Sequence, residues 1–126
     1  MELWQLTASA ASSLMANKQL SSAAYTQALL ERIALRDTQV HAWVSVDPQQ
    51  AMAQARACDA QSRRGPLHGI PVGVKDIINT RDLPTQHNSP LYAQHQSGED
   101  ANCVGVLRAA GAHARRIVER FWRRSR

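Results

Sequence analysis

The sequence has little of what marks a secreted, membrane-spanning or metal-binding protein. No apolar stretch approaches the roughly 20 residues needed to cross a bilayer, so we expect no transmembrane segment. The opening residues, MELWQLTASAASSLMANK, lack a basic start followed by an apolar block, which predicts no secretory signal and a cytoplasmic location. Two cysteines, Cys58 and Cys103, are too few for a disulfide framework. The five histidines show no close pair at ligand spacing, so we assign no metal site.

The composition is that of one ordinary globular domain, because the chain has 126 residues, of which 44% are hydrophobic and 20% charged. The net charge of +5 raises the question of a nucleic-acid partner, yet it is confined to one end. Residues 113–126, HARRIVERFWRRSR, hold six arginines and one glutamate, which account for all of it. Residues 1–112 are therefore neutral overall, and we expect no nucleic-acid partner from them.

Local signals predict an α/β order of elements. Helix caps, Pro and Gly positions and apolar spacing set their limits. In chain order we expect a helix from Thr7 to about 17, a helix from Ser21 to 36–37, a strand at 41–46, a helix at 48–61 capped by Asp47, a strand at 72–78, a long loop, and a helix at about 101–110 closed by Gly111. A mixed α/β plan then calls for a buried apolar strand, where the sequence supplies the basic residues 113–126 instead.

One residue of the predicted 72–78 strand is out of place. The run GIPVGVKDII sets Lys75 among apolar neighbours, and Asp76 faces the other side of a strand. A lysine of this kind often packs its stem and extends its charged head to water. Alternatively, burial favours the uncharged amine, which can accept a proton as a general base. The residues alone leave both interpretations open.

Several blocks, in order, resemble the opening part of the amidase signature family. They are GPLHGIPVGVKDIINT, LPTQHNSPLY and DANCVGVLRAAGA, preceded by a similar stretch from about residue 3. The resemblance covers residues 3–112. It implies an α/β fold made of the N-terminal helices and first strands of the family's mixed-sheet α/β/α architecture.

The resemblance also implies a chemistry, which is hydrolysis of a small carboxamide without metal or organic cofactor. The family's triad is a lysine, a serine in a cis peptide bond and a nucleophilic serine, and Lys75 matches the lysine. Both serines belong to a Gly/Ser-rich segment well downstream of the lysine, and no such segment follows Lys75 here. The family portion is therefore expected to be truncated, and the chain to be inactive alone.

Two questions stay open at this point. The amidotransferase subunit that releases ammonia from glutamine for transfer to misacylated tRNA shares the lysine motif, so the chain equally resembles part of such a subunit. The division into residues 1–112 and a non-matching tail, 113–126, has two explanations. The tail is a frameshift product, or residues 114–124 form a basic amphipathic helix that binds a polyanion or a membrane surface.

Overall fold

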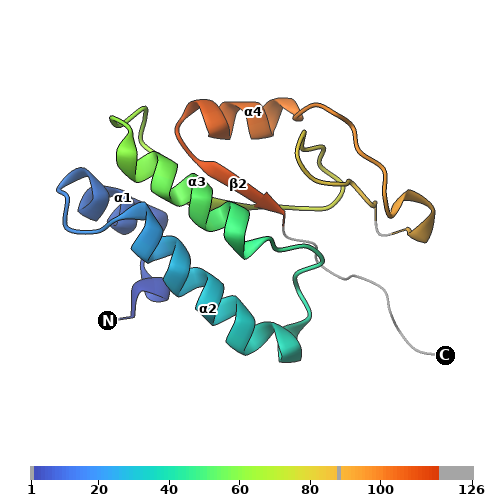
Figure 1. The fold of residues 1–126 in the computed structure, drawn as a ribbon, viewed down its shortest axis with the longest axis horizontal. Coiled ribbons are helices and arrows are strands. Elements are labelled where there is room, and N and C mark those ends of the chain that lie inside the picture. The colour runs from blue at the N-terminus through green and yellow to red at the C-terminus, as the bar shows by residue number, and fades with distance from the viewer. Residues whose placement is uncertain (1, 88, 117–126) are drawn as a thin grey trace.

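The computed structural model describes residues 2–87 and 89–116 (Figure 1). The chain forms, in order, a 3₁₀ turn η1 (Leu3–Gln5), α1 (Ala8–Ala16), α2 (Ser22–Val40), α3 (Pro48–Ala60), β1 (Pro71–Val74), a 3₁₀ turn η2 (Pro90–Tyr92), α4 (Asn102–Ala109) and β2 (His113–Arg116). Among the described residues, no helix combines the length and apolar character that a membrane crossing requires.

The three predicted N-caps of the first helices are confirmed. The side chains of Thr7, Ser21 and Asp47 each accept a hydrogen bond from the backbone N–H three residues on, at the start of α1, α2 and α3. These bonds satisfy N–H groups that have no partner inside the helix. Local sequence chemistry thus fixes where each helix begins.

The expected end of the second helix and the strand after it are both wrong. The helix continues to Val40 and closes at His41, whose φ of 53° lies in the left-handed region. The Asp37 carboxylate then accepts the N–H groups of Ala42 and Trp43, at 2.7 and 3.2 Å. Because the side chain of Asp37 binds the backbone here, residues 41–46 form an irregular connection.

The two strands form a parallel pair in which Pro71 lies opposite His113 and Val74 opposite Arg116. In Figure 1, β2 runs between α3 and α4, and α2 lies beyond α3. This arrangement confirms the α/β class, with helices on either side of the sheet.

The strand His113–Arg116 occupies the position where the α/β plan called for an apolar strand. An amphipathic helix beginning at residue 114 is therefore wrong for residues 114–116. The remainder of that predicted helix, 117–124, lies outside the described residues.

A close approach of two turns sets the strands beside each other. Leu67 N–H donates to Ala110 O at 3.1 Å, and Gly69 N–H donates to Gly111 O at 3.1 Å. Gly111 has a φ of +95°, and a Cβ there would lie 2.6 Å from the Cα of His68. Only glycine combines that backbone conformation with that lack of space. Gly111 therefore closes α4, as predicted, and also seats the turn before β1.

The main core lies between α1, α2 and the turn before β1. Ala11, Tyr25 and Ile70 are buried there, with partly buried leucines and Met15 packed around them. Next to this core, buried polar groups join α2 to the turn before β1 and to β2. Ser22 Oγ donates to Gly69 O at 2.6 Å, and Thr26 Oγ1 lies 3.3 Å from Nε2 of the buried His113. The strand pair is thereby held to the helical layer by specific hydrogen bonds as well as by packing.

Candidate active site

Lys75 follows directly after the last residue of β1, so it sits at the carboxyl end of a parallel strand. The predicted strand to Ile78 is wrong, because the N–H of Ile78 donates to Lys75 O at 3.0 Å and turns the chain. Of the two interpretations that the sequence left open, the described part of the chain shows the exposed side chain. Lys75 is exposed, as is 55% of Ile77. The strand thus delivers Lys75 to the surface of the described part of the chain.

Asp76 faces the opposite way, as the strand-like alternation predicted. It is only 1% exposed, and its Oδ1 accepts the N–H of Gln86 at 2.8 Å. Its backbone carbonyl oxygen lies 3.4 Å from the donating N–H of His87. Sequence reasoning missed this role, although an aspartate followed by a polar loop is a common donor-binding arrangement in turns. Asp76 ties the loop to the backbone that carries Lys75.

The long loop after Lys75 is ordered by polar contacts. Thr80 and Thr85 are buried, and Thr85 N–H donates to His95 O at 2.7 Å. Arg108 of α4 forms ion pairs with Asp82, near the start of the loop, at 3.1 Å and with Asp100, near its end, at 2.9 Å. A small apolar cluster of Val74 and Val104, with Ile78 and Ala101, lies beneath it. Hydrogen bonds, ion pairs and apolar packing therefore hold this loop in place beside the end of β1.

The two cysteines were considered as candidate functional residues from the sequence, and the structure gives them different environments. Cys58 is buried in α3, and removal from water raises the pKa of its thiol. Cys103 is exposed on α4. Among the described residues, no group of three or more His, Cys, Asp or Glu side chains could hold a metal ion.

Hydroxyl groups in the described part serve helix ends and turns. Ser21 and Ser89 cap the starts of α2 and η2, and Ser22 binds Gly69 O. Ser12 Oγ donates to Pro66 O, and Ser97 Oγ donates to Glu99 O at 2.8 Å. Each of these serines is engaged with backbone groups, in keeping with the turn and cap roles expected of such side chains.

A cavity of about 820 Å³ opens between the α1–α2 turn, the end of α3 and the turn before β1. Ser22, Cys58, Asp59, Arg63 and His68 are among its lining residues, and Lys75 is not. Asp59 accepts the N–H groups of Ser22 and Ala23, so the start of α2 is already satisfied there. The cavity is separate from the lysine site.

Comparison with known proteins identifies the family to which this sequence is similar. The family model described as Amidase matches residues 24–114, two residues beyond the limit of 112 inferred from the sequence. One of the subunits of the glutamyl-tRNA(Gln) amidotransferase of Roseiflexus castenholzii is 43% identical over 113 residues, which cover 87% of this chain and 23% of that protein.

Solved structures agree. The native peptide amidase of Stenotrophomonas maltophilia superposes with a TM-score of 0.78 at 33% identity, over 91% of this chain and 24% of that one. An amidase family protein of Bacillus anthracis superposes with a TM-score of 0.81 at 26% identity, over 92% and 24% respectively. The chain thus spans about a quarter of the length of the relatives that it matches.

Proposed function

This chain belongs to the amidase family, and from that premise we propose that Lys75 is the catalytic lysine of a centre that hydrolyses carboxamides. One observation carries the proposal, which is the position of Lys75. It lies in the block that resembles the family's lysine motif, at the carboxyl end of β1. Ligands of α/β proteins gather at such strand ends. The neighbouring Asp76 fixes the backbone there through Gln86 and His87.

The proposed chemistry is acyl transfer through a serine. The uncharged Lys75 amine accepts a proton from the bridging serine, which takes the proton of the nucleophilic serine. The nucleophile's oxygen bonds to the amide carbon, the C–N bond breaks, and the amine leaves with a proton. Water then attacks the acyl-enzyme and releases the carboxylic acid. Backbone N–H groups near the nucleophile hold the negative oxygen.

The exposure of Lys75 bears on this proposal. A proton acceptor works as the uncharged amine, and burial favours that form. We propose that the two serines and the surface that covers Lys75 come from family segments beyond the quarter matched here. By this account residues 2–116 hold the base but not the nucleophile, so the chain alone is inactive.

Glutamine is a second candidate substrate. The observation that raises it is the 43% identity to one of the subunits of the glutamyl-tRNA(Gln) amidotransferase. The lysine chemistry is the same in both cases, and only the acyl group differs. Ammonia release from glutamine, measured beside release from peptide amides, separates the two.

A chimera tests the proposal. Residues 1–114 of this chain would replace the matched quarter of the S. maltophilia peptide amidase, and ammonia release would be measured from peptide amides and from glutamine. We expect turnover by the folded chimera and none by the 126-residue chain. An inactive but folded chimera, or turnover by the chain alone, would contradict the proposal. If the long exchange fails to fold, exchange of residues 69–112 provides the same test.

A further inference from the structure

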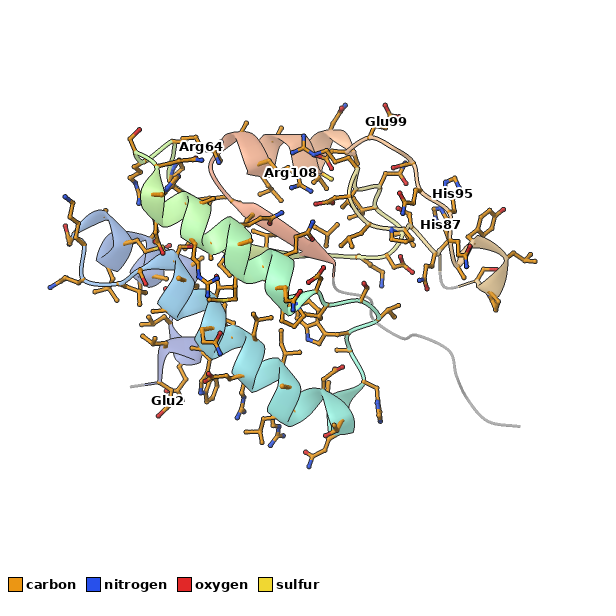
Figure 2. The ribbon with its side chains drawn as sticks, in the orientation of Figure 1. Glu2, Arg64, His87, His95, Glu99 and Arg108 are labelled. Carbon is orange, nitrogen blue, oxygen red and sulfur yellow. The ribbon has the colours of Figure 1, made fainter. Side chains whose placement is uncertain are left out.

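The loop beside Lys75 carries a cluster of three rings that the proposed chemistry does not use. His87 and His95 have ring centroids 6.3 Å apart. Tyr92 packs edge-on against both, at 5.4 and 6.0 Å. Figure 2 shows the two histidines side by side, near η2. They are eight residues apart, so their spacing in the sequence gave no sign of the pair.

We propose that His87 and His95 form a binding site for a divalent transition-metal ion, with water in its remaining positions. Neutral imidazole is a preferred ligand of zinc, copper and nickel ions. Both rings are exposed, so an ion can reach them from solvent. The proposal is independent of the role of Lys75, and either can fail without the other.

The separation of the rings suits a shared ion. A metal–nitrogen bond of about 2.0–2.1 Å puts an ion about 3.2 Å from each ring centre, so two rings on one ion lie at most about 6.4 Å apart. The observed 6.3 Å is within that limit. A tetrahedral angle brings the centres to about 5.2 Å, a closure of about 1 Å that exposed side chains make by rotation about χ1 and χ2.

The backbone holds the pair in place. Thr85 N–H donates to His95 O at 2.7 Å, and His95 N–H donates to Tyr92 O at 2.9 Å. His87 is anchored through its N–H to Asp76 O, and its φ of +50° is uncommon outside glycine. An unusual backbone conformation that the surroundings maintain is a reason to look for a function there. Together these contacts reduce the ordering cost of binding.

Tyr92 is the positioning residue of this cluster. Its ring touches both imidazoles, so its removal frees them, whereas loss of its hydroxyl alone leaves the ring contacts unchanged. We therefore expect Tyr92→Phe to bind metal like the unmodified chain and Tyr92→Ala to bind more weakly.

The test is titration of the full 126-residue chain with Cu²⁺, the strongest binder among the first-row divalent ions, at pH 7.5 in a non-coordinating buffer. We expect one ion per chain by calorimetry and two nitrogen ligands by electron paramagnetic resonance. His87→Ala and His95→Ala should each weaken binding at least tenfold.

The matched controls are His41→Ala, an exposed histidine on a different element, and Cys103→Ser, an exposed thiol. Neither should change the affinity, and Mg²⁺ should not bind, because it prefers oxygen ligands. Binding that survives in the His87→Ala, His95→Ala double variant, or that disappears in either control, would overturn the proposal. So would the absence of Cu²⁺ binding by the folded chain.

Discussion

Two regions of the molecule differ in how completely their apolar side chains are buried. The closed region comprises residues 3–30, the turn 65–70 and residues 111–113, where apolar side chains meet one another and buried polar groups meet backbone partners. In the open region, residues 75–109, the described part buries the apolar side chain of Val104 against Val74 of β1 and leaves Ile77, Leu91 and Val106 55–90% exposed.

The contrast assigns different tasks to the two regions. The closed region holds β1 beside β2, and this sets where the carboxyl end of β1 lies in the fold. The open region begins at Lys75 and carries the groups that would face substrate, metal or further chain. Its order depends on polar tethers, namely Asp76, Thr85 and the Arg108 ion pairs. We therefore expect the closed region to set global stability and the open region to respond locally.

The largest effect should come from Gly111→Ala in the closed region. Its φ of +95° and the 2.6 Å approach to His68 leave no room for a methyl group. We expect a loss of about 3 kcal/mol in the free energy of unfolding, measured by urea denaturation.

The matched control is Gly105→Ala in α4, where no atom lies within 4 Å of an added Cβ. This helical position should gain about 0.5–1 kcal/mol. Equal effects at the two glycines would remove the distinction between the regions.

Ser22→Ala should have the next largest effect. The Ser22 hydroxyl is buried and donates to Gly69 O at 2.6 Å, linking α2 to the turn before β1. Its loss leaves a buried carbonyl without this donor and should cost about 1–3 kcal/mol in urea unfolding. Ser13→Ala, an exposed position of α1, should change stability by less than about 0.5 kcal/mol.

Asp76→Ala tests the open region. Without its carboxylate, Gln86 loses its 2.8 Å acceptor and the loop loses its attachment to β1. Hydrogen exchange measured by mass spectrometry should speed up in residues 79–101, while protection in α2 stays near that of the unmodified chain. Glu99→Ala, at an exposed position of the same loop, serves as control. An equal increase in α2 would show that the two regions unfold together.

The cysteines give a smaller contrast, between the buried thiol of Cys58 in α3 and the exposed thiol of Cys103 in α4. Burial raises the pKa of the Cys58 thiol, so little thiolate forms there, whereas Cys103 is exposed. At pH 8, iodoacetamide should label Cys103 at least tenfold faster than Cys58, as followed by mass spectrometry. Labelling at equal rates in the native chain would show that α3 does not shield Cys58.

Alkaline pH should lower the stability of the chain slightly. Burial raises the pKa of both Cys58 and Tyr25 above their ordinary values of 9.0 and 10.0. A raised pKa adds stability that is complete below the ordinary value and is lost as pH rises through the raised one. The urea midpoint should therefore fall from pH 9 upward, and Cys58→Ala should remove part of that fall. A midpoint that stays constant up to pH 11 would contradict this.

The sequence predicted what depends on neighbours along the chain. Thr7, Ser21 and Asp47 cap their helices as expected, and Gly111 ends α4. The errors arose where a side chain competes with regular structure. Asp37 binds the backbone that was assigned to a strand at 41–46, and the turn closed by Ile78 ends β1 four residues early.

For the candidate site, the motif located Lys75 but not its surroundings. Its exposure depends on the turn at 75–78, and the role of Asp76 depends on a partner ten residues away. The His87–His95 pair likewise exists only because the loop closes between Thr85 and His95. Contacts of this range are set by tertiary folding, which a single sequence records only weakly.

The most direct test of the account uses the two lysines of the chain, Lys75 and Lys18, in the peptide amidase chimera. Lys75→Met should lower kcat/KM for amide hydrolysis by at least about 10³-fold, because the proposed catalytic base is lost. Lys18→Met, in the exposed turn between α1 and α2, should leave kcat/KM unchanged. Activity that persists after Lys75→Met in the folded chimera would contradict the assignment of Lys75 as the catalytic lysine.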